Sequence, residues 1–72
     1  MVRAVEVGGN TVRQRRRIVE LTQAELATAV GVSRQTIISI EGGDYAPSVF
    51  LALRVARALE TTVEDLFDPE LA

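Results

Sequence analysis

Residues 22–43 read TQAELATAVGVSRQTIISIEGG, and the signals in this stretch fall at the intervals expected of two short helices joined by a turn. Thr22 and Glu25 have the spacing of a capping box, in which the threonine hydroxyl accepts from a first-turn N–H and the glutamate reaches back. Gly31 stands where the chain must leave the first helix, and we expect a positive φ there. Ser33 has the position of an N-cap for a second helix.

The two predicted helices, at about 23–30 and 34–41, each carry an apolar stripe that would face the other helix and the core. These inward residues are Leu26, Ala27, Val30, Ile37 and Ile40. Ala27 is small, so the helices can approach closely at that point. A unit of this shape can lay its second helix in a DNA major groove, which is wide enough to admit one.

Composition excludes several classes of function. With 72 residues the chain forms one domain, and it contains neither cysteine nor histidine. Disulfides, the usual zinc ligand sets and any nucleophile–base arrangement are therefore not expected, and we predict a protein without enzymatic activity, metal or cofactor. No run approaches the roughly 18 apolar residues of a membrane span. The N-terminal segment does not resemble a secretory signal, so the expected location is the cytoplasm without a membrane partner.

Charge is divided unevenly along the chain, although the net charge is only −2. Residues 1–40 contain six arginines and three acidic residues, whereas residues 41–72 contain two arginines and seven acidic residues. A phosphate backbone responds to the charge of the nearby surface rather than to the total. The basic N-terminal half is therefore compatible with DNA binding.

Outside this unit the sequence predicts three further helices, each from a capping residue followed by apolar residues at helical spacing. They run from Asn10 or Thr11 to about Val19, from Ser48 to about Leu59, and from Thr62 to about Phe67. The predicted fold is all-α, with five short helices around one core. The expected organisation is an N-terminal arm at 1–9, a helical domain at 10–68 and a tail at 69–72.

Two features leave alternative interpretations open. Val5 and Val7 lie at strand spacing, so residues 1–9 form either a frayed arm or a short edge strand that pairs with a second subunit. Phe50 follows the start of the fourth predicted helix, and Leu51 continues the core stripe. Phe50 is either an exposed contact for a dimer or partner, or a residue packed under the loop of Tyr45.

Four segments together resemble the Cro–repressor (Xre-like, lambda-repressor-like) family of helix-turn-helix proteins: LTQAELA at 21–27, GVSRQTIISIE at 31–41, YAPS at 45–48 and TVEDLF at 62–67. The similarity covers about residues 10–67. It implies a five-helix domain that binds double-stranded operator DNA, usually as a homodimer, with the third helix in the major groove.

Position by position, the resemblance implies that Arg34, Gln35 and Ser39 contact bases. Arginine pairs bidentately with guanine and glutamine with adenine. The residues expected at phosphates are Gln23 and Ser33, joined by Arg13 and Arg17 on one helix face and by a backbone N–H of Gly43. Arg16 and Glu41 match the positions of a family ion pair, whereas Arg15, where the family often has leucine, is expected to be solvated.

The sequence also departs from the family pattern. The loop that commonly reads Asn-Gly-Lys is Gly42-Gly43-Asp44 here, which replaces an ammonium by a carboxylate beside the phosphates and should weaken binding by about 1 kcal/mol or more. Glu20 and Glu60 stand where the family usually ends a helix with glycine. We expect a strained left-handed conformation or an altered turn at both.

Two functional hypotheses follow. The first is a sequence-specific transcriptional regulator that acts as a homodimeric repressor. The second is a protein-interaction module, such as the antitoxin of a toxin–antitoxin pair, suggested by Phe50, the acidic C-terminal half and the weakened loop at 42–44.

Overall fold

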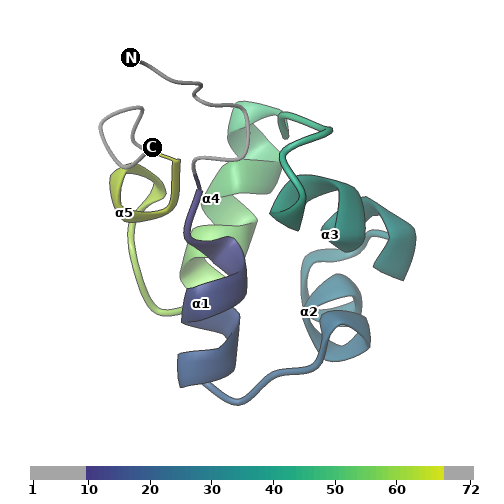
Figure 1. Cartoon of the computed structure of the whole chain (residues 1–72). Coiled ribbons are helices and arrows are strands. Elements are labelled where there is room, and N and C mark those ends of the chain that lie inside the picture. The colour runs from purple at the N-terminus through teal and green to yellow at the C-terminus, as the bar shows by residue number, and fades with distance from the viewer. Residues whose placement is uncertain (1–9, 68–72) are drawn as a thin grey trace.

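Side-chain N-caps begin four of the five helices in the computed structural model, which describes residues 10–67 (Figure 1). The helices are α1 (Val12–Ile18), α2 (Gln23–Val30), α3 (Arg34–Glu41), α4 (Val49–Ala58) and α5 (Val63–Phe67). The Thr22 hydroxyl accepts from the N–H of Glu25 at 3.0 Å, and the Glu25 carboxylate accepts from the N–H of Thr22 at 2.8 Å. Ser33, Ser48 and Thr62 cap α3, α4 and α5 through their hydroxyls alone, each of which accepts from the N–H three residues later. The predicted all-α fold is confirmed.

Two helices end close to glutamates, and one ends at a glycine, at the positions where the sequence predicted turns. Gly31 ends α2 with φ of 79°, and its N–H bonds the carbonyl of Ala27 at 2.9 Å. Glu20 and Glu60 also adopt positive φ, at 62° and 59°, so the expected strain at these two non-glycine positions is present.

Of the two residues expected to cap α1, Asn10 does so and Thr11 does not. The side-chain oxygen of Asn10 accepts from the N–H of Val12 at 3.1 Å, while its amide nitrogen donates to the carbonyl of Ile40 at 2.9 Å. Thr11 makes no side-chain cap; its N–H bonds the carbonyl of Leu66 at 3.0 Å. These bonds fix the first helix against both α3 and α5.

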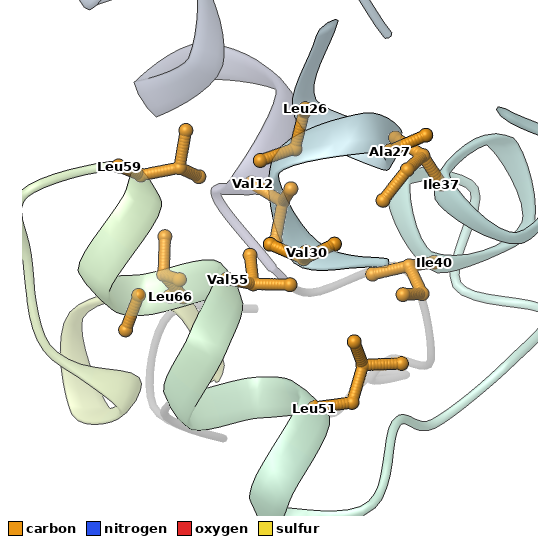
Figure 2. Packing of buried hydrophobic residues seen from close by; sticks show 11 residues of the cluster. Val12, Leu26, Ala27, Val30, Ile37, Ile40, Leu51, Val55, Leu59 and Leu66 are labelled. Atoms are coloured by element: carbon orange, nitrogen blue, oxygen red, sulfur yellow. The ribbon is translucent and has the colours of Figure 1, made fainter. Parts of the chain in front are cut away.

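All five helices contribute to one apolar core, whose side chains converge in Figure 2. The core residues are Val12, Leu26, Ala27, Val30, Ile37, Ile40, Leu51, Val55, Ala56, Leu59 and Leu66. Each fully buried aliphatic side chain contributes about 1.5–3 kcal/mol. This number of buried aliphatic side chains accounts for a core formed without a disulfide.

The arrangement of the helices leaves α3 at one side of the domain. In Figure 1, α2 and α3 form one side, α5 forms the other, and α1 and α4 lie between them. Contacts join α2 to α3 and α4, and α5 to α1 and α4. Within residues 10–67 no helix is long and apolar enough to cross a membrane.

Candidate functional site

Helix α3 has one buried face and one exposed face. Ile37 and Ile40 are at most 1% exposed and face the core. Arg34 and Gln35 are exposed, and Ser39 is half-buried. The side chains that the sequence assigns to base contacts are therefore on the outer side of the helix, and their contact with DNA stays a prediction.

A shallow basic depression of about 380 Å³ lies beside the first turn of α3. It is lined by Arg13, Arg16, Arg17, Thr22, Gln23, Ala24 and Arg34. Four arginines from α1 and α3 therefore surround the beginning of α2, whose first N–H groups carry the positive end of the helix dipole. Such a surface attracts an anion, and three of the residues expected at phosphates line it.

Glu41 holds two of the side chains that line this depression, those of Arg16 and Gln23. Its carboxylate accepts from Arg16 Nε at 2.6 Å and from Gln23 Nε2 at 3.2 Å. Arg16 also donates to the carbonyl of Leu21 at 2.8 Å. The Arg16 and Glu41 side chains are only 10% and 5% exposed, so this ion pair is shielded from water and weakly screened.

Gln23 is oriented by the same carboxylate. Its amide nitrogen carries two N–H groups, of which one points to Glu41. The second N–H can donate toward the depression. Glu41 thus holds the side chain in one orientation, and the phosphate contact of Gln23 stays a prediction.

Two other residues expected at phosphates use their polar groups inside the protein. The Ser33 hydroxyl caps α3 and lies 3.0 Å from the Thr36 hydroxyl. Gly43 is buried with φ of 82°, and its N–H donates to the carbonyl of Ile40 at 3.0 Å. Because this N–H is already bonded within the protein, the structure does not support the phosphate contact expected of the Gly43 amide. The hydroxyl proton of Ser33 can still be donated outward, and its phosphate contact stays a prediction.

Arg15 is not the solvated residue that the sequence suggested. Its Nε donates to the carbonyl of Leu59 at 3.0 Å and its Nη2 to the carbonyl of Glu60 at 2.9 Å. These carbonyls end α4, where the dipole is negative and the chain turns through the strained Glu60. The sequence signal for this role is the end of α4 at Glu60 in place of glycine. Such a helix end leaves carbonyl oxygens to which a cation can donate hydrogen bonds.

Replacing Arg15 by alanine should lower the free energy of unfolding by about 1.5–3 kcal/mol, because two hydrogen bonds to a charged group are lost. Urea unfolding followed by circular dichroism measures this change. Arg13→Ala, an exposed arginine on the same helix, is the matched control and should change stability by at most about 0.5 kcal/mol. Equal stability of the two variants would contradict the role given to Arg15.

The remaining predicted contacts are distributed as follows. Phe50 is 78% exposed, so the alternative in which it packs under the Tyr45 loop is wrong. Ile38 is half-buried on α3. Val5 and Val7 lie outside the described residues. A second shallow depression, along the far edge of α3, is lined by Gln35, Thr36, Ser39, Asp44 and Tyr45.

The sequence of this chain is similar to those of known helix-turn-helix proteins. A family model described as helix-turn-helix matches residues 12–66. An uncharacterized HTH-type transcriptional regulator of Methanothermobacter thermautotrophicus is 54% identical over 57 residues, which is 78% of this chain and 83% of the relative.

Two solved structures share the arrangement of helices. The DNA-binding domain of the P22 C2 repressor superposes with a TM-score of 0.80 at 27% identity, over 97% of this chain and 92% of that one. The restriction-modification controller protein C.AhdI from Aeromonas hydrophila gives 0.75 at 30% identity, over 85% and 92%.

Proposed function

The chain belongs to the helix-turn-helix family of DNA-binding transcriptional regulators, and we propose that it is a homodimeric repressor that places α3 in the major groove of its operator. One observation carries this proposal. Arg34 both begins the exposed face of α3 and lines the basic depression, so base-reading and phosphate-binding residues form one continuous surface.

On this surface the outer residues of α3 read the bases. The guanidinium of Arg34 matches guanine O6 and N7, and the amide of Gln35 matches adenine N6 and N7. The Ser39 hydroxyl, one turn further along, can donate or accept. These contacts supply sequence preference.

The depression holds the phosphate backbone. Arg13 and Arg17 supply positive charge, and Gln23 supplies a neutral donor. Ser33, the N-cap of α3 outside the depression, supplies a further hydroxyl donor. The first turn of α2 lines the same depression, and the N-terminus of a helix favours an anion. These contacts supply affinity and register without sequence preference.

Repression is the simplest regulatory outcome of such a surface, because it requires only that the protein occupy its site. The structural likeness to the DNA-binding domain of the P22 C2 repressor supports this choice. Two copies related by a two-fold axis would present their α3 helices about 34 Å apart, one helical turn of DNA.

Selection from random DNA duplexes tests the proposal. We expect recovered sequences with two-fold symmetry, half-sites about one helical turn apart, and conserved guanine and adenine positions in each half. Affinity for the selected duplex should fall with salt, with a slope of about −0.9 for each phosphate neutralised. Recovery of no enriched sequence at low and at moderate salt would contradict the proposal.

A further inference from the structure

The loop after α3 turns back onto that helix and is held there by two backbone hydrogen bonds. Its chain reverses at Gly43, which has a φ of 82° and donates its N–H to the carbonyl of Ile40 at 3.0 Å. The N–H of Asp44 donates to the carbonyl of Ser39 at 2.9 Å. This pair of bonds is the Schellman motif of a helix C-terminus. The backbone of Asp44 is therefore fixed beside the end of α3.

The Asp44 carboxylate lies beside two of the residues that read bases in the proposed function. Asp44 is exposed and lines the second depression together with Gln35 and Ser39. Its Oδ2 is 3.6 Å from the point that a Cβ on Gly42, the C-cap of α3, would occupy. A carboxylate is unfavourable at this negative end of the helix dipole. A residue that departs from a local stability rule on a binding surface is a candidate for a functional role.

A carboxylate in this place distinguishes the bases by the groups that they present in the major groove. An ionised carboxylate only accepts hydrogen bonds. Guanine presents two acceptors, thymine an acceptor and a methyl group, and adenine an acceptor beside its amino donor. Cytosine alone presents a donor, its N4 amino group, without an acceptor of its own. The carboxylate therefore binds cytosine and is repelled by the O4 of thymine and the O6 of guanine.

We propose that Asp44 is a specificity-determining residue that accepts a hydrogen bond from the N4 amino group of a cytosine in the operator. This role rests on the proposed function, because it requires α3 to lie in the major groove. It adds one base to those read by Arg34, Gln35 and Ser39. Arg34 begins α3 and Asp44 follows its end, so the cytosine lies beyond the adenine of Gln35, on the side away from the guanine of Arg34.

The charge of Asp44 also lowers affinity for other sequences. Phosphates repel a carboxylate, so Asp44 weakens binding to any duplex, and the hydrogen bond to cytosine offsets this loss only at the operator. Specific interfaces commonly combine such a repulsive element with an attractive one. The carboxylate that replaces the ammonium common in the family therefore raises the ratio of operator affinity to general affinity.

Asp44→Asn tests this role in titrations of labelled duplexes, because asparagine keeps the shape of aspartate without its charge. The duplex is the site selected with the parent chain, which should contain the cytosine. Changing its C·G pair to T·A should weaken binding of the parent chain by about 10-fold. The same change should weaken Asp44→Asn by at most about two-fold, since an amide can donate to thymine O4 as well as accept from cytosine N4. Asp44→Asn should bind an unrelated duplex more tightly than the parent does.

Glu64→Gln is the matched control, because it removes an exposed carboxylate from α5, on the other side of the domain from α3 (Figure 1). It should show the same 10-fold loss as the parent on the T·A duplex. Circular dichroism should show that Asp44→Asn melts no lower than the parent, since the substitution removes a negative charge from the C-terminal end of α3. A change in sequence preference is then separate from a change in stability.

The role of Asp44 and the proposed function fail in different ways. A selected operator without a conserved cytosine at this place would overturn the role of Asp44 and leave the regulator. So would an Asp44→Asn chain that binds every duplex more tightly but keeps the 10-fold preference, because the carboxylate would then act on phosphates alone. Recovery of no enriched sequence by the parent chain would overturn both.

Discussion

Replacing Arg34 and Gln35 together by alanine is expected to lower affinity for the selected operator by about 100-fold or more. Each good bidentate contact to a base contributes about 1–3 kcal/mol of discrimination, and about 1.4 kcal/mol corresponds to a factor of ten. Both side chains are exposed at the start of α3, and alanine is a favourable helix residue. The fold should therefore survive the change.

Titration of labelled duplexes at fixed salt measures this loss. The double variant should bind the operator about as weakly as it binds an unrelated duplex, because both bidentate contacts that read bases are removed. Arg13→Ala is the matched comparison, since Arg13 lines the depression rather than the outer face of α3. It should weaken both duplexes alike and make the salt slope shallower by about 1.

Two outcomes would count against this division of roles. Unchanged affinity and unchanged sequence preference in the double variant would remove Arg34 and Gln35 from base recognition. Loss of sequence preference in Arg13→Ala would show that the depression reads bases as well as phosphates.

Replacing Arg16 by methionine is expected to lower the free energy of unfolding by about 3–5 kcal/mol, because the Glu41 carboxylate would remain buried without its cation. In the structure that carboxylate is 5% exposed and accepts from Arg16 at 2.6 Å. A small domain is commonly stable by only about 5–15 kcal/mol in total. The variant should therefore be largely destabilised at elevated temperature.

Urea and thermal unfolding measure the effect. The double variant Arg16→Met, Glu41→Met should recover much of the stability, because no unpaired charge is then buried. Arg13→Met places the same side chain at an exposed position of the same helix and should change stability by at most about 0.5 kcal/mol. A loss below about 1 kcal/mol in Arg16→Met would show that water screens the pair as it does a surface salt bridge.

Local interactions made much of the fold predictable from the sequence. The capping box of Thr22 and Glu25 joins residues three apart, and the inward pair Ile37 and Ile40 follows the helical repeat. Gly31 takes the left-handed conformation that its place after an apolar stripe indicated. The limits of α2 and α3 followed from these features, since each depends on neighbours within one helical turn.

The site was predictable in part, for the same reason. That Arg34 and Gln35 face outward follows from their phase relative to the buried isoleucines of α3. That Arg34 meets Arg13 and Gln23 around one depression does not follow from the sequence, because this requires α1 and α2 to be placed against α3.

By itself, then, the sequence determined the helices of the central unit, their buried stripes and the outward face of α3, because capping and periodicity act over three or four residues. Tertiary structure alone decided that Arg15 satisfies carbonyls 44 and 45 residues away, that the amide of Gly43 turns inward, and that Phe50 stays exposed. These outcomes depend on which polar groups and apolar faces remain without a partner once the helices have packed. The spacing of residues along the chain does not specify which groups and faces those are.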